Sequence, residues 1–262
     1  NSFSNNFSGQ QDGCIIKLDN SLSTIIWSAY LGGSSDDAIY SLALDNLNNI
    51  YVTGGTLSSN FPTTTNSYQT THHDTVEADA FITKISSNGN QLLTSTYFGT
   101  QHYDQSYFVE IGSNNNVYLF GQTKSEGLNL VYNSAYYEPD GGQFISVFNP
   151  NLSQLIRSTV FGSGKGTPDI SPTAFLVDLC DKIYIAGWGS SLGGPLSTLN
   201  LPVTPTAFQA NTDGNDMYLM VLDDLLNNII YATYFGGTQS SEHVDGGTSR
   251  FDKRGIIYQS VC

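Results

Sequence analysis

The chain has 262 residues, of which 39% are hydrophobic and 12% aromatic, and its net charge is −14 with only nine Lys and Arg residues. This composition can build a sizeable core and excludes a globally disordered chain. The acidic balance excludes nucleic acid as a partner, because Lys and Arg supply the contacts to phosphates. No run approaches about 18 consecutive apolar residues, so we predict no membrane insertion.

Four similar segments follow one another along the chain. They open at Asp12, Asp79, Gly142 and Asp216, and each is followed 18 residues later by Tyr30, Tyr97, Val160 or Tyr234. A constant spacing of this kind marks a repeated supersecondary unit. We therefore predict one repeat domain over residues 1–262, with repeats at about 11–76, 77–139, 140–212 and 213–262.

Each repeat contains four strand-like runs, which are clearest at 79–85, 91–99, 106–112 and 116–122. Asn, Gly and Ser residues that favour turns separate these runs, and no segment has a helical period. Several runs, such as 217–222, are apolar on both faces, which indicates sheets covered on both sides. The pattern predicts an all-β fold, a β-propeller of four-stranded antiparallel blades with four repeats visible.

Recurring aromatic residues and cysteines give further expectations about packing. Tyr51, Tyr118, Tyr184 and Tyr258 recur in the last run of each repeat, and we expect them to pack between blades. Cys14 takes the place of Phe81 and is expected to be a small buried hydrophobe. A disulfide between Cys180 and Cys262 stays an open alternative.

The longest and most variable connections are residues 56–78 and 189–212. Variable loops at one rim of a scaffold are where binding specificity usually resides, so we expect these two loops to form the contact surface. On this hypothesis, replacing either loop with a short Gly-Ser turn abolishes attachment and leaves thermal stability nearly intact.

The residues that could carry chemistry are few. His243 and Asp245 alternate along one segment and are the candidates for a metal site, with a polar network between blades as the alternative. His72, His73 and His102 are interpreted as loop residues. Acidic turns such as 213–216 are candidate Ca²⁺ ligands, although the EF-hand spacing is absent. No catalytic residue and no cofactor-binding residue is predicted.

Two stretches resemble a known family. Residues 36–64 (DDAIYSLALDNLNNIYVTGGTLSSNFPTT) and 78–99 (ADAFITKISSNGNQLLTSTYFG) resemble the SBBP β-propeller repeat of secreted bacterial proteins. The third repeat departs from it at Gly142 and Val160. The segment from 158 to the end is similar to large surface proteins of the Bacteroidota, which are typically exported by type IX secretion and associated with gliding motility or adhesion. Asp74-Thr75-Val76 resembles the O-glycosylation site of that phylum, which makes Thr75 a candidate for modification.

The resemblance implies an extracellular or cell-surface location. Because the chain opens and closes inside the repeat pattern, we also expect it to be part of a larger protein, with a closed four-bladed ring as the alternative. The resemblance also implies a non-catalytic binding or scaffolding role, with adhesion as one candidate. The expected partners are surface glycans or polymers, neighbouring domains of the same protein and the type IX secretion machinery. The alternatives are an enzyme that acts on polysaccharide and a passive spacer in a surface fibre.

Overall fold

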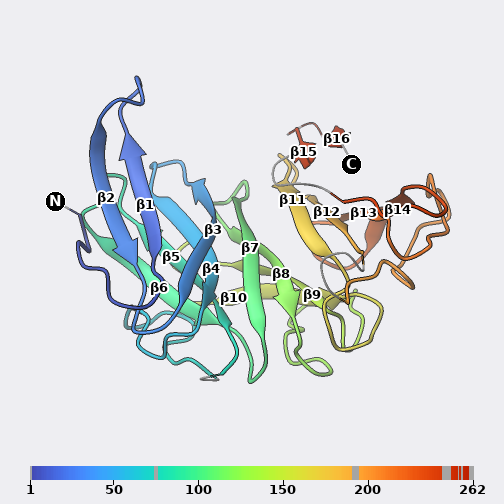
Figure 1. Ribbon diagram of the computed structural model, residues 1–262, viewed down its shortest axis with the longest axis horizontal. Helices are drawn as coiled ribbons and strands as arrows, with labels where there is room; N and C mark the ends of the chain where they lie inside the picture. The colour runs from blue at the N-terminus through green and yellow to red at the C-terminus, as the bar shows by residue number, and fades with distance from the viewer. Residues whose placement is uncertain are drawn as a thin grey trace.

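The computed structural model describes residues 2–73, 76–190, 195–243, 249–252, 254 and 256–259. Within these residues the chain forms sixteen β-strands and no helix. The strands make three four-stranded and two two-stranded antiparallel sheets (Figure 1). The prediction of an all-β propeller is confirmed. No helix in the described part of the chain has the length and hydropathy to cross a membrane.

The first two sheets are the hairpin β1–β2 and the sheet β3–β6. Their strands are β1 (Gly13–Leu18), β2 (Ile25–Leu31), β3 (Asp37–Leu44), β4 (Ile50–Thr56), β5 (Asp79–Ile85) and β6 (Leu92–Phe98). The second four-stranded sheet contains β7 (Asp104–Ile111), β8 (Val117–Thr123), β9 (Gln143–Phe148) and β10 (Leu155–Phe161). The third contains β11 (Ser171–Val177), β12 (Ile183–Trp188), β13 (Met217–Leu222) and β14 (Ile229–Phe235). The last hairpin pairs β15 (Ser249–Phe251) with β16 (Ile257–Gln259).

The sheets and the sequence repeats are out of phase by half a unit. In each complete sheet the first two strands end one repeat and the last two strands begin the next, as where β4 pairs with β5. The constant spacing of 18 residues therefore corresponds to the two strands and the turn of a blade's outer hairpin, such as β5–β6. Four repeats give three complete blades, a half blade β1–β2 that holds outer strands, and a half blade β15–β16 that holds inner strands.

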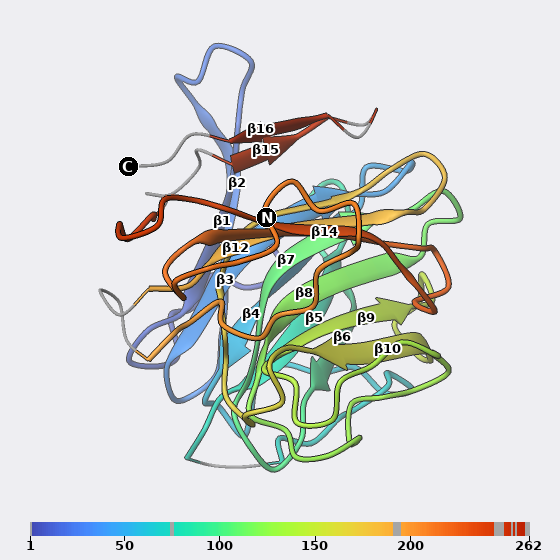
Figure 2. The same cartoon turned by 90° about the vertical axis from the view of Figure 1, so that its right-hand side faces the viewer.

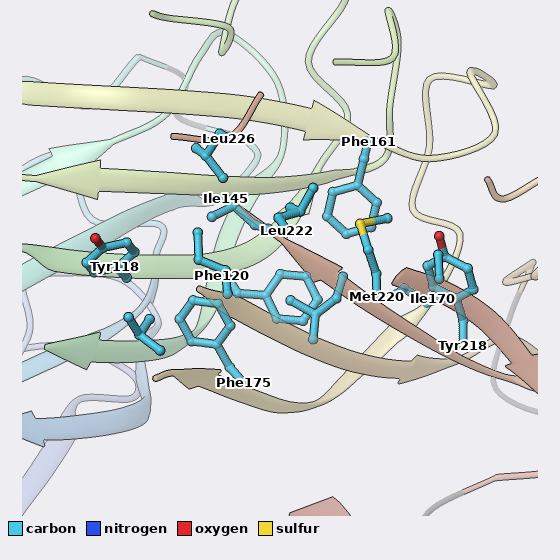
Figure 3. Packing of buried hydrophobic residues seen from close by; sticks show 14 of the residues in the cluster. Tyr118, Phe120, Ile145, Phe161, Ile170, Phe175, Tyr218, Met220, Leu222 and Leu226 are labelled. Atoms are coloured by element: carbon cyan, nitrogen blue, oxygen red, sulfur yellow. The ribbon is translucent and has the colours of Figure 1, made fainter. Parts of the chain in front are cut away.

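Successive sheets pack face to face, with a hydrophobic cluster at each interface. The cluster between the second and third blades includes Phe120 on β8, Phe175 on β11 and Met220 on β13 (Figure 3). A second cluster joins the first and second blades through residues such as Phe98 and Phe144. Two further clusters join β1–β2 to the first blade and Phe251 of β15 to the third. Alternate residues of one strand thus fill different interfaces, which explains runs that are apolar on both faces.

The innermost strands are β3, β7, β11 and β15, because each of these strands contacts the next one in the series. Figure 1 shows the sheets following one another in chain order from β1–β2 on the left to β11–β14 on the right. In the view turned by 90°, the strands β7 to β10 lie one below another as a single twisted sheet (Figure 2).

Long loops between the second and third strands of each blade run along the outermost strand. In the first blade the Thr64 amide donates to the Ser95 carbonyl on β6, and the Tyr97 amide donates to the Gln69 carbonyl. The third blade repeats this pattern between Thr204 and Ala232 and between Gln209 and Tyr234. The loops therefore supply partners to an edge strand that would otherwise expose its backbone.

Of the recurring tyrosines, Tyr51 and Tyr118 are buried, Tyr184 is partly buried and Tyr258 is exposed. Tyr51 is fully buried and donates its hydroxyl to the Pro150 carbonyl of the next blade at 2.9 Å. Tyr118 lies in the cluster between the second and third blades. Tyr184 lies beside Phe251, with ring centroids 5.9 Å apart. Tyr258 is exposed, because no strand of a following blade covers it among the described residues.

The expectation of a buried Cys14 is wrong. Cys14 is exposed, whereas Phe81 at the equivalent position of β5 is fully buried. Phe81 is covered by Phe61 of the loop that precedes β5, with ring centroids 4.4 Å apart. Cys180 is an exposed free thiol, and Cys262 lies outside the described residues.

Candidate functional site

Buried acidic residues recur where one blade passes into the next. The first acid of each pair opens or directly precedes the third strand of a blade, and the second opens or precedes the inner strand of the following blade. The pairs are Asp12 with Asp37, Asp79 with Asp104, and Asp216 with Glu242. In each pair the amide of the second acid donates to the carbonyl of the residue just before the first acid, at 2.7 to 3.0 Å. The same local geometry is therefore built three times.

Each second acid also closes the turn between blades. Asp37 accepts from the Gly33 amide at 2.6 Å, Asp104 from the Thr100 amide at 2.6 Å, and Glu242 from the Gly237 amide at 2.9 Å. A glycine lies between the two carboxylates. A Cβ on Gly236 would lie 2.0 Å from Asp216 Oδ1 and 2.6 Å from Glu242 Oε2, so only glycine fits there.

Burial of two acidic side chains close together raises the pKa of at least one member of each pair. Burial, together with the nearby Asp79 carboxylate, raises the pKa of Asp104 to about 7, although hydrogen bonds from Thr123 and Thr100 act in the opposite direction. Burial also raises the pKa of Asp37 and of Asp216, with Asp12 and Glu242 acting in the same direction. A carboxyl that is desolvated beside another carboxyl favours its neutral form.

At the junction between the second and third blades, a lysine balances the charge of the buried acid Asp169. Gly142 replaces the first acid there, and the Lys165 ammonium lies 3.0 Å from Asp169 Oδ1. The long loop of the second blade also lacks the glutamine that contacts the first acid in the other two blades. Gln69 and Gln209 donate to Asp79 and Asp216 at 3.2 and 3.1 Å in the blades that keep both residues. The acidic pairs thus belong to the joints between blades.

A different site, the rim groove, lies between the loops of the first and second blades. One cavity of about 410 Å³ is lined by Tyr68, Tyr132 and residues 153–155. The Tyr68 amide donates to the Leu152 carbonyl of the neighbouring blade at 2.9 Å, which fixes this tyrosine across the blade boundary. Tyr132 is held on β10 by two backbone hydrogen bonds to Ser158. Both rings are about half exposed.

A second cavity of about 580 Å³ continues the rim groove on the other side of Tyr68. It is polar, and its lining side chains include Gln69, His73, His102, Glu126 and Asn129. Burial raises the pKa of Tyr68, and the nearby Tyr132 adds to this shift. The rim groove therefore combines two exposed aromatic faces with amide, imidazole and carboxylate groups that can form hydrogen bonds.

The histidines of the sequence occupy separate environments. His72 contacts the Thr56 carbonyl through Nε2 at 3.0 Å, whereas His73 Nδ1 lies 2.9 Å from the Gln69 amide nitrogen. His73 and His102 both line the second cavity of the rim groove. His243 packs edge-on against Trp188, with ring centroids 6.1 Å apart, and its proposed companion Asp245 lies outside the described residues. Thr75, the candidate for glycosylation, also lies outside them.

The acidic turns hold backbone groups. Asp213 accepts from the Asn215 amide at 2.9 Å, and Asp223 accepts from the Asn227 amide at 2.7 Å. In the part of the chain that the structure describes, no three His, Cys, Asp or Glu side chains gather in a way that could hold a metal ion. Calcium binding at these turns stays a prediction.

Of the two loops that form the rim groove, the sequence predicts a binding role for one. Tyr68 belongs to the predicted contact loop 56–78, but Tyr132 and Glu126 lie in a loop that was given no role. Residues from four separate segments meet there, and no spacing within the sequence connects them. The repetition of Ser67-Tyr68-Gln69 as Ala207-Phe208-Gln209 was the available signal for an exposed aromatic at this rim.

A comparison with known protein families agrees with the architecture. A family model described as SBBP, a beta-propeller repeat, matches residues 26–62, which run from β2 through β4 to the start of the following loop. The chain is also similar to a solved protein of unknown function from Bacteroides caccae. That alignment has 10% identity and a TM-score of 0.25, and it covers 87% of this chain and 91% of the other. No curated protein matches. Residues 26–62 are thus similar to an SBBP-type repeat, in agreement with the propeller fold.

Proposed function

We propose that this propeller is a non-catalytic binding module of a secreted or cell-surface protein, and that its ligand is a surface glycan or related polymer. The observation that carries the proposal is the rim groove, in which Tyr68 and Tyr132 expose aromatic faces beside polar side chains. Sugar rings present apolar C–H faces and a border of hydroxyls, and an exposed tyrosine offers both an aromatic face and a hydroxyl.

The origin of the groove also supports this reading. Its walls come from two blades that are locked together by a hydrophobic cluster and by the hydrogen bond from Tyr68 to Leu152. Loops on a rigid scaffold keep their side chains in place before a ligand arrives, which lowers the entropic cost of binding. A role in adhesion, export by type IX secretion and an outer-surface location belong to the same proposal and rest on the repeat resemblance.

Substitution of Tyr132 tests the glycan proposal. Tyr132 is 54% exposed, so Tyr132→Ala is expected to leave the unfolding temperature nearly unchanged and to weaken binding of a retained polysaccharide about threefold to tenfold, the effect of losing one aromatic contact. Gln154→Ala, at the same cavity, is expected to weaken binding less. The assay is affinity electrophoresis against a panel of bacterial and plant polysaccharides.

Phe208→Ala is the control, because Phe208 is a 77% exposed aromatic residue at the place in the third blade that corresponds to Tyr68, and it lies outside the rim groove. Equal losses for Tyr132→Ala and Phe208→Ala would place the contact surface elsewhere. Release of oligosaccharides from any polymer of the panel would replace the binding role with an enzymatic one.

A further inference from the structure

The rim groove extends beyond the two cavities that contain Tyr68. A third cavity of about 780 Å³ shares Glu126 and Asn129 with the second cavity, just as the second shares Tyr68 with the first. The three cavities therefore form one continuous groove, which has Tyr132 at one end and the turn 164–166 at the other. Its walls come from the first two blades and from the turn that follows the second.

The groove follows the outer strand of the second blade. Residues 153–155, at the start of β10, line the first cavity, and residues 164–166, just beyond its end, line the third. Because β10 has seven residues, a rise of about 3.3 Å per residue makes the groove roughly 20 Å long. A chain of several sugar units matches this length, whereas a single sugar ring would fill only one cavity.

Hydrogen bonds fix the far end of the groove in place. The Gly127 amide donates to Asp140 Oδ1 at 2.5 Å, and the Gly166 amide donates to the Asp140 carbonyl at 2.8 Å. Asp140 thus joins the long loop of the second blade to the turn after β10. The third cavity is therefore formed before a ligand arrives, which lowers the entropic cost of filling it.

The charged side chains of the groove decide which class of polymer fits. Lys124 and Lys165 line the third cavity, but their ammonium groups lie 3.0 Å from Glu77 Oε1 and 3.0 Å from Asp169 Oδ1. Glu126 is exposed and has no ion-pair partner among the described residues. The charge that the groove offers to a ligand is therefore negative, as is the net charge of −14. This charge repels an acidic polymer, whereas sugar hydroxyls can donate to the Glu126 carboxylate.

We propose that the rim groove binds an uncharged, linear polysaccharide along its length, an inference that rests on the binding function proposed above. One part of the chain stacks on Tyr68 and Tyr132, and the next part forms hydrogen bonds with Glu126 and Asn129. Because these last two residues belong to both the second and the third cavity, they lie in the interior of the groove, where a bound chain excludes water best. They therefore determine specificity more than residues at either end.

Polymers with the same backbone and different charge test the class of ligand. The pairs are hydroxyethyl cellulose with carboxymethyl cellulose, dextran with dextran sulfate, and methyl-esterified with de-esterified homogalacturonan. In affinity electrophoresis of the full chain at low salt, the retained polymer is expected to be the uncharged member of its pair, with the acidic member bound at least about tenfold more weakly. Equal or tighter binding of an acidic member that Tyr132→Ala still weakens would overturn this inference and leave the proposed function intact. No retention of any polymer in the panel would refute both.

Reversing the charge of Glu126 tests the origin of this selectivity. Because Glu126 is exposed, Glu126→Lys is expected to leave the unfolding temperature nearly unchanged and to strengthen binding of the acidic member at least about fivefold. Asp224→Lys makes the same change of charge at an exposed position outside the groove and is the matched control. Equal gains for the two variants would assign the selectivity to net charge and overturn the role of the groove.

Oligosaccharides of increasing length, prepared from the retained polymer, test whether the three cavities act as one site. Their affinity, measured by isothermal titration calorimetry, is expected to rise with each added sugar until the oligomer spans the groove and then to stay constant. A disaccharide that binds as tightly as the longest oligomer would confine the ligand to one cavity and overturn the proposal of an extended chain.

Discussion

Replacing residues 57–73 with a short Gly-Ser turn is expected to unfold the first blade. This loop carries Phe61, which is only 3% exposed and packs on Phe81 and Tyr97 with ring centroids 4.4 and 5.9 Å apart. Removing a buried aromatic side chain costs about 3–5 kcal/mol. The Tyr97 hydroxyl would also lose the Ser58 carbonyl, to which it donates at 2.7 Å.

Further losses come from the polar contacts of the loop. Gln69 donates to Asp79 and accepts from the Gly99 amide, so it joins the loop to the acidic junction. Stranding buried polar groups costs about 1–3 kcal/mol each. The combined loss exceeds about 5 kcal/mol, which is comparable with the whole stability of many domains. We therefore expect the transition in a urea titration to shift strongly or to split into two.

Two further variants keep this prediction testable. Replacing residues 20–23, which are all exposed in the turn between β1 and β2, is expected to change stability by less than about 1 kcal/mol. Phe61→Ala alone is expected to fold and to lose about 3 kcal/mol. If the replacement of 57–73 unfolds at the same urea concentration as the parent chain, the loop does not hold the outer strand.

This expected outcome differs from the one that the sequence alone supports for the same loop. Variable length and many Thr and Pro residues are typical of a surface connection that can be exchanged. The repeated Phe61-Pro62 and Leu201-Pro202 were a sign of packing, because an apolar residue at the same place in two loops indicates a common buried contact. Only the structure shows that Tyr97 and Tyr234 donate their hydroxyls to these loops.

The fold was more predictable than the sites for a physical reason. Period-two apolar runs and a fixed hairpin length are local properties, so they reveal strands and their repetition without knowledge of distant contacts. The leading Asp79 is a repeat marker in the sequence, but its partner Asp104 lies in the connection just before the predicted strand 106–112. Their pairing depends on how a turn brings two blades together, and the rim groove depends on loops of two blades in the same way.

The acidic junction between the first two blades predicts a stability that falls as pH rises. The pKa of Asp104 is raised from 3.8 to about 7, chiefly by burial. Between these values the unfolded chain loses its proton while the folded chain keeps it. Folding therefore becomes less favourable with each step in pH, by up to about 1.4 kcal/mol per unit. The stabilising effect is complete below the unfolded pKa and is lost as pH passes through about 7.

Asp37 and Asp216 act in the same direction, because burial also raises their pKa values. Asp19 acts in the opposite direction, since hydrogen bonds led by the Ser23 amide lower its pKa to about 2. Its contribution is lost as pH falls. Substitutions at Asp104 and Asp19 should therefore change the pH profile with opposite signs, which separates the junction from a general effect of net charge.

Asp104→Asn is the variant that isolates the junction. The amide oxygen can still accept from the Thr100 amide, and the amide nitrogen can donate toward Asp79, so the turn keeps its hydrogen bonds without a buried charge. We expect the variant to match the parent near pH 4 and to exceed its unfolding free energy by about 2–4 kcal/mol at pH 8. Urea titrations between pH 4 and pH 8 measure this difference, with Asp19→Asn as the control. Parallel profiles for Asp104→Asn and the parent would show that Asp104 is already ionised in the folded protein, and the junction would then need a compensating cation.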